Sequence, residues 1–118
     1  YARTASILRK GGFTDAEVTR RVAQDGIELT HPAERSLAIQ LLQFEEALQS
    51  VHADYAPNHL VDYVYSMAES FSRFNEQCRV LDAESDAVMT TRLALVLLTG
   101  RVIRKSLELL GIEVVDRM

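Results

Sequence analysis

The side chains best suited to metal binding or nucleophilic chemistry in this chain are three histidines and one cysteine. His31, His52 and His59 do not share a metal-ligand spacing, and we interpret them as solvated or helix-capping residues. Cys78 has no second cysteine with which to form a disulfide or a CxxC zinc motif, which fits a reducing compartment. We therefore predict no metal site.

Known catalytic and phosphate-binding motifs are also missing from the sequence. It contains no GxSxG nucleophile motif, no paired Ser, His and Asp pattern, and no GxGxxG or GKS/T phosphate loop. Residues 1–118 are therefore expected to be non-catalytic and to hold no cofactor.

The basic residues are unevenly distributed in a chain whose net charge is −4. Residues 1–11 hold three bases and no acid, residues 12–69 hold three bases and ten acids, and residues 70–118 hold seven of each. A negative net charge argues against a nucleic-acid partner, but distribution matters more than the sum. If both ends of the chain lie on one side of the fold, a basic face is possible on an acidic protein.

The elements that position these residues are expected to be helices. Apolar residues recur at helical spacing in five stretches, which are residues 1–11, 14–26, 31–56, 58–81 and 87–110. The first is typical of the last turns of a helix that begins before Tyr1, with Gly11 as a left-handed stop. Thr14 and Glu17 form a predicted capping box, and Gly26 is expected to end that helix. The stretch 31–56 is one helix or two.

The pattern predicts an all-α bundle of four to five main helices, because no strand alternation or repeat is found. The stretch 58–81 has one apolar face, whereas 87–110 is apolar on more than one side, as a central helix would be. With 118 residues and 47% hydrophobic content we expect one domain over residues 1–118. The longest apolar run, Leu93 to Leu98, is too short to cross a bilayer, and no leader peptide opens the chain.

Five segments together resemble a known module. They are "YARTASILRK", "LTHPAERSLAIQLLQFEEAL", "LVDYVYSMAESFSRFNEQCRVL", "TRLALVLLTGRVIRKSLELLGI" and the terminal "DRM". In this order and at these separations they resemble the C-terminal anticodon-binding domain of arginyl-tRNA synthetases, called the DALR domain. The resemblance covers about nine tenths of the chain and is weakest in residues 11–28 and 82–90.

The resemblance implies that this chain is a C-terminal fragment of a longer class I aminoacyl-tRNA synthetase. Such an enzyme activates arginine with ATP, together with Mg²⁺, and esterifies it to tRNA on an upstream catalytic domain. No HIGH-like or KMSK-like signature of that domain occurs in this sequence. The expected partners are the anticodon loop of tRNA(Arg) and the catalytic domain of the same chain. We expect a cytoplasmic monomer that does not contact membranes.

Every arginine codon has G at its second position, so every matching anticodon has C at its centre. A pocket for that cytosine needs a donor for O2 and N3, an acceptor for N4 and a flat wall. The resemblance implies that Arg9 donates to the base, that Phe74 stacks on it, and that Cys78 occupies the place of a second aromatic. It also implies that the terminal Met118, carried by an ordered C-terminal tail, supplies a soft apolar wall.

Some of these residues also have purely structural interpretations. Phe74 belongs to an apolar stripe, Cys78 departs from the aromatic of the family, and Arg9 suits the dipole at a helix end. Arg3 and Arg79 are the first candidates for phosphate contacts because they lie near the pocket positions in the sequence. Net acidity and Cys78 leave an alternative function open, namely a helical protein-interaction or dimerisation module that has lost RNA binding.

Overall fold

The computed structural model describes residues 1–54, 57–81 and 83–111, and within these ranges it contains six helices and no strand. The helices are α1 (Ala2–Gly11), α2 (Asp15–Asp25), α3 (Pro32–Leu42), α4 (Phe44–Asp54), α5 (Pro57–Gln77) and α6 (Asp86–Leu109). Gln43 alone separates α3 from α4, so the stretch that the sequence left as one helix or two is a broken helix. The predicted all-α bundle is confirmed.

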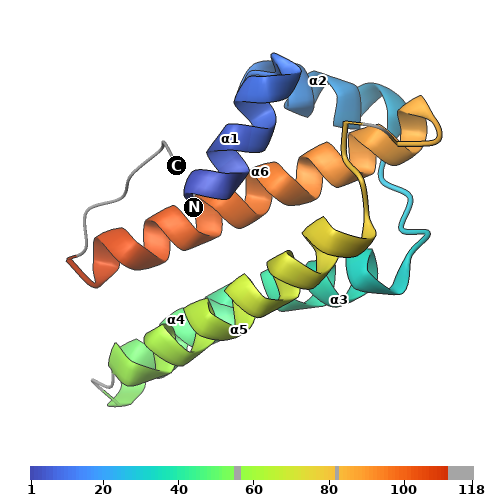
Figure 1. Ribbon diagram of the computed structural model, residues 1–118. Coiled ribbons are helices and arrows are strands. Elements are labelled where there is room, and N and C mark those ends of the chain that lie inside the picture. The colour runs from blue at the N-terminus through green and yellow to red at the C-terminus, as the bar shows by residue number, and fades with distance from the viewer. Residues whose placement is uncertain (55–56, 82, 112–118) are drawn as a thin grey trace.

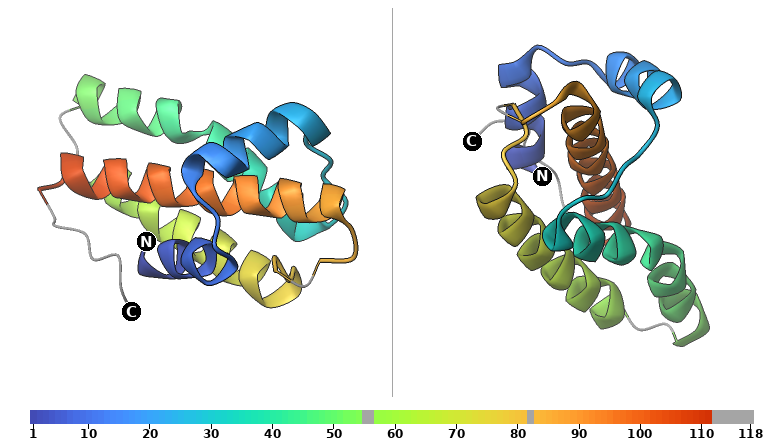
Figure 2. Two further views of the ribbon diagram at one scale, coloured as in Figure 1. Left: turned by 90° about the horizontal axis from the view of Figure 1, so that it is seen from above. Right: turned by 90° about the vertical axis from the view of Figure 1, so that its right-hand side faces the viewer.

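Helix α6 runs through the middle of the bundle. Figure 1 shows α1 and α2 on one side of it and α3, α4 and α5 on the other, and the end-on view in Figure 2 shows the same division. Residues 90–97 of α6 are buried at every position, because neighbours cover the helix from both sides. This confirms the expectation that the most apolar stretch forms a central helix.

Local capping signals mark where α2 and α3 begin. The Thr14 hydroxyl accepts a hydrogen bond from the Glu17 amide at 3.2 Å, which confirms Thr14 as the N-cap and supplies one of the two bonds of the predicted capping box. His31 caps α3 by accepting from the Ala33 amide through Nδ1 at 3.0 Å, as expected for a capping histidine. One prediction was off by a residue, since Gly11 still belongs to α1 and the left-handed cap is Gly12, with φ 73°.

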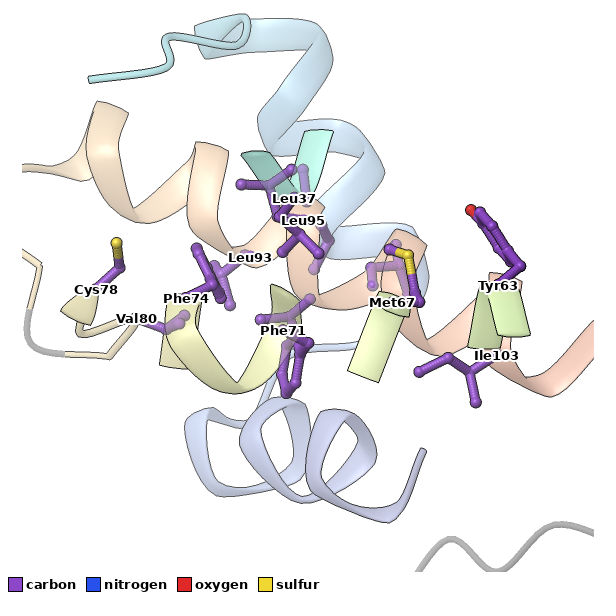
Figure 3. Packing of buried hydrophobic residues seen from close by; sticks show 14 of the residues in the cluster. Leu37, Tyr63, Met67, Phe71, Phe74, Cys78, Val80, Leu93, Leu95 and Ile103 are labelled. Carbon is purple, nitrogen blue, oxygen red and sulfur yellow. The ribbon is translucent and has the colours of Figure 1, made fainter. Parts of the chain in front are cut away.

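Helix α5 packs its apolar stripe against α3 and α6. Leu60, Met67, Phe74 and Cys78 are each at most 1% exposed, and Phe71 is 5% exposed. Figure 3 shows Phe74 directed into the core beside Leu93, while Phe71 lies on the side of α5 that faces α1. The predicted face of α5 is therefore confirmed as core.

A buried ion pair joins α3 to α6. Arg92 Nε donates to Glu34 Oε2 at 2.6 Å, and both side chains are almost completely buried. The other carboxylate oxygen, Oε1, accepts from the backbone amides of Thr30 at 2.8 Å and His31 at 3.0 Å. Both oxygens of the carboxylate are thus satisfied, as a buried charge requires.

Helices α1 and α6 lie close together at Gly100. A Cβ atom placed on Gly100 would lie 2.7 Å from Thr4 Oγ1 and 3.3 Å from Thr4 Cβ. Thr4 is itself buried and donates from Oγ1 to the Tyr1 carbonyl at 2.6 Å, so it has no room to move away. The glycine is required here for close helix packing.

We therefore expect Gly100→Ala to lower the free energy of unfolding by about 1–3 kcal/mol through overpacking, in spite of the better helix propensity of alanine. Urea unfolding followed by circular dichroism measures this change. Adding Thr4→Ala should recover part of the loss, because it removes the atoms that the new methyl group meets. A Gly100→Ala variant as stable as the parent chain would contradict the close contact.

Candidate nucleic-acid interface

The grooves beside α1 gather most of the basic residues of interest. One of them, the α1/α6 groove, has a volume of about 400 Å³. It is lined by Tyr1, Thr4, Ala5, Leu8, Arg9, Phe13, Asp15, Val96, Leu97, Gly100, Arg101 and Arg104. Its walls come from α1, the start of α2 and the distant helix α6, and it combines apolar and charged side chains.

Three guanidinium groups, those of Arg9, Arg101 and Arg104, line the α1/α6 groove. Arg101 Nη2 lies 3.5 Å from Asp15 Oδ2, and Arg104 Nε lies 3.1 Å from Glu108 Oε1. All four side chains in these two pairs are more than half exposed. Exposed pairs contribute only about 0–1 kcal/mol, so a phosphate group can compete for Arg101 and Arg104.

Two aromatic rings also line the α1/α6 groove. The Arg104 guanidinium carbon lies 5.8 Å from the centre of the Tyr1 ring, and Arg104 Nη1 donates to the Tyr1 hydroxyl at 3.3 Å. Arg21 lies over the Phe13 ring at 5.4 Å. Guanidinium planes and aromatic rings are the surfaces on which unpaired bases stack, so the groove has the chemistry of a single-stranded RNA site.

Two smaller grooves lie on the α5 side of α1. The Arg79 groove, of about 370 Å³, is lined by Ile7, Lys10, Asn75, Glu76, Cys78, Arg79, Val80 and Leu81. The Arg3 groove, of about 230 Å³, is lined by Tyr1, Arg3, Thr4, Ala68, Phe71, Ser72 and Ile103. Helix α1 thus presents basic residues to grooves on both of its flanks.

The basic residues that were predicted to contact RNA are accessible, whereas the predicted base contacts Phe74 and Cys78 are buried. Arg3, Arg9 and Arg79 are exposed, and each lines a groove beside α1. Phe74 is 0% exposed and packs in the core, which supports a packing role. Stacking of a base on Phe74 stays a prediction, and it would require the core to open. Met118 and the tail from residue 112 lie outside the described residues.

Cys78 is a buried thiol at the edge of the Arg79 groove. Burial raises its pKa, an effect that the nearby Arg92 opposes and Glu34 reinforces. A thiol that stays protonated in an apolar setting is chemically inert. Its 1% exposure supports a structural part in the groove wall, whereas a direct contact with a base stays a prediction.

From the sequence, Arg101 and Arg104 ranked behind Arg3 and Arg79 as possible phosphate contacts, and Tyr1 was not considered as a site residue. Arg101 and Arg104 are three residues apart on α6, which places them on one face of the helix. That spacing was a signal, but only the packing of α1 against α6 brings Arg9 and Tyr1 beside them. The expectation of a basic face is supported in this part of the fold.

Metal sites and membrane spans are not found in the part of the chain that the structure describes. No three His, Cys, Asp or Glu side chains gather there so as to hold a metal ion. No helix within the same residues has the length and hydropathy to span a membrane.

A family model described as the DALR anticodon binding domain matches residues 1–118. The chain belongs to this family. The match includes residues 11–28 and 82–90, where the sequence resemblance was weakest, and it confirms the family predicted from the five sequence segments. The α1/α6 groove is therefore a groove on a DALR anticodon-binding domain.

Curated relatives of this DALR domain are arginine–tRNA ligases. The domain is 51% identical to the arginine–tRNA ligase of Rhodopirellula baltica, 43% identical to that of Sodalis glossinidius and 41% identical to that of Proteus mirabilis. Each alignment covers all of this chain but only 18% or 20% of the relative, so the chain spans about a fifth of their length. These relatives give no support to an interaction module without RNA binding.

Proposed function

We propose that this DALR domain binds the anticodon loop of tRNA(Arg) and that the α1/α6 groove is its main RNA-contacting surface. The observation that carries the proposal is the convergence of Arg9, Arg101 and Arg104 on one groove with the Tyr1 ring, in a chain of this family. Guanidinium groups supply donors for phosphates and base edges, and the apolar side chains of the groove shield the bases from water.

The proposal extends to the longer protein. Residues 1–118 would form the single anticodon-binding domain of an arginine–tRNA ligase that joins arginine to tRNA(Arg) with ATP and Mg²⁺ in the cytoplasm. Catalysis would belong to a domain outside this chain. The chain itself would be the C-terminal part of the enzyme, would be monomeric and would not catalyse the reaction. The support is the identity to arginine–tRNA ligases over the whole chain.

Within the site, Arg9 is proposed to donate to the central cytosine of the anticodon, and Met118 to contribute an apolar wall. Arg3, Arg79, Arg101 and Arg104 are proposed to meet phosphates, since each lines a groove beside α1. A cytosine differs from a uracil in its N3 acceptor and N4 amino group, so a site that pairs with both atoms discriminates between the two bases.

The test is binding of the chain to the anticodon stem-loop of an arginine tRNA and to a variant in which the central C is replaced by U. We expect the U variant to bind roughly 5- to 150-fold more weakly, which corresponds to about 1–3 kcal/mol for one base read by hydrogen bonds. Fluorescence anisotropy at a fixed salt concentration measures both affinities.

The matched control is a stem-loop in which one G·C pair of the stem is reversed and the loop is unchanged. It should bind as tightly as the parent stem-loop. Equal affinity for the C and U loops would rule out readout of the central base, and binding to neither loop would rule out the proposed RNA role of this chain.

A further inference from the structure

The segment that follows α5 is held in place by the buried ion pair. Helix α5 ends at Gln77, so the carbonyl of Arg79 lies beyond the hydrogen-bond ladder of the helix. Arg92 Nη1 of α6 donates to this carbonyl at 2.8 Å, while Arg92 Nε is bound to Glu34 at 2.6 Å. One planar guanidinium group therefore connects α3, α6 and the chain that leaves α5.

This connection determines which side chains of the segment reach solvent. Cys78 and Val80, on either side of Arg79, are 1% and 5% exposed, whereas Arg79 is exposed in its groove. Figure 3 shows Cys78 and Val80 as part of the core cluster at the end of α5. With its two neighbours anchored and its carbonyl bound, Arg79 has little freedom to turn away from the Arg79 groove.

The same segment also contacts the end of α1. A Cβ atom on Gly11 would lie 2.6 Å from Leu81 Cδ2, so Leu81 packs directly against the last turn of α1. That turn carries Arg9 and Lys10. The far end of residues 78–81 is therefore anchored on α1, which holds the segment from a second side.

We propose that Arg92 is a positioning residue of the RNA site, which acts through the Arg79 backbone and never touches RNA itself. The inference rests on the proposed function and adds a buried side chain that holds an RNA-contacting residue in place. Arg92 has a side-chain exposure of only 7%, which excludes direct contact with a phosphate. Glu34 contributes to the same positioning, because it orients the Arg92 guanidinium and binds the loop before α3.

The test is a double-mutant cycle between Arg92→Lys and Arg79→Ala, read by affinity for the anticodon stem-loop of an arginine tRNA. Lysine keeps the charge beside Glu34 but lacks the planar fork that holds two acceptors at once. Each single variant should bind about fivefold more weakly, the size of one lost charge-assisted contact. The double variant should also lose only about fivefold, because Arg79 is already misplaced.

Arg101→Ala is the matched control, since Arg101 lines the other flank of α1 and hydrogen bonds to Asp15, which lies outside the Arg92 network. The Arg92→Lys/Arg101→Ala double variant should bind the stem-loop about 25-fold more weakly than the parent chain, the product of two independent fivefold losses. All affinities are measured at a temperature where circular dichroism shows each variant fully folded. If Arg92→Lys does not fold, the pair Glu34→Gln with Arg92→Gln, which leaves no buried charge, replaces it in the cycle.

The outcomes separate this inference from the proposed function. Effects of Arg92→Lys and Arg79→Ala that multiply, or an unchanged affinity in either single variant, would overturn the positioning role while RNA binding stands. If the unsubstituted chain fails to bind the stem-loop, the proposed function fails and the positioning role falls with it.

Discussion

Glu34→Gln is expected to lower the free energy of unfolding of this domain by about 3–5 kcal/mol, the largest stability effect that we predict for a single substitution. The change leaves the Arg92 guanidinium buried with its charge uncompensated, 2.6 Å from a neutral amide instead of a carboxylate. Since small domains are stable by only about 5–15 kcal/mol, the loss is a large part of the total. Urea or thermal unfolding measures it.

Glu108→Gln is the matched control, because Glu108 also pairs with an arginine but is 52% exposed. It should cost less than about 0.5 kcal/mol. Equal losses in the two variants would show that burial does not increase the contribution of the Glu34–Arg92 pair to the free energy of unfolding.

The same pair predicts how stability depends on pH. Burial opposes ionisation of Glu34, but the hydrogen bonds from Arg92, Thr30 and His31 outweigh it and hold the pKa of Glu34 below its ordinary value of 4.5. A carboxyl group whose pKa falls on folding stabilises the fold above its unfolded pKa and loses this contribution as the pH drops through its folded pKa. Below about pH 4.5, the parent chain should therefore lose more stability than Glu34→Gln.

Replacing Arg9, Arg101 and Arg104 together by alanine is expected to weaken binding of the anticodon stem-loop by about two orders of magnitude at low salt. Three charge-assisted contacts of roughly 1 kcal/mol each would be lost. The slope of log affinity against log salt concentration should become less steep by about 1.4, since Arg101 and Arg104 are each proposed to contact a phosphate and each such contact with a single strand contributes about 0.7. A salt titration of both proteins measures the two quantities.

A triple variant with the same change in charge is the control. Arg20, Arg35 and Arg73 are exposed, and none of them lines a groove beside α1. Their joint replacement by alanine should have a much smaller effect on affinity. Equal weakening in the two triple variants would mean that the net charge of the domain matters and that the α1/α6 groove does not.

The helices could be predicted from the sequence to within a few residues, because the signals that start and stop them are local. The Thr14 N-cap and the apolar stripe of α5 lie where they were expected. The first helix ends one residue later than predicted, since Gly11 and Gly12 are both able to end a helix and the sequence does not say which one turns left-handed.

The candidate site was only partly predictable. Arg3, Arg9 and Arg79 are exposed, as the predicted RNA contacts require, and the contacts themselves stay predictions. Phe74 lies in the apolar stripe of α5, which indicated burial, whereas the family resemblance implied a base contact, and its complete burial supports the packing role. Glu34 and Arg92 were not recognised as partners, although a charge within the apolar run of α6 is itself a signal.

The family, the all-α class and the approximate positions of the helices could all be inferred from residue order, since they depend on ordered motifs and on periodicity within about 20 residues. Which charges share a surface became clear from the folded chain. Arg104 and Tyr1 are separated by 103 positions, and Arg92 and Glu34 by 58, yet both pairs are in direct contact. Such contacts follow from how whole helices pack, because packing joins helix faces regardless of their distance along the chain.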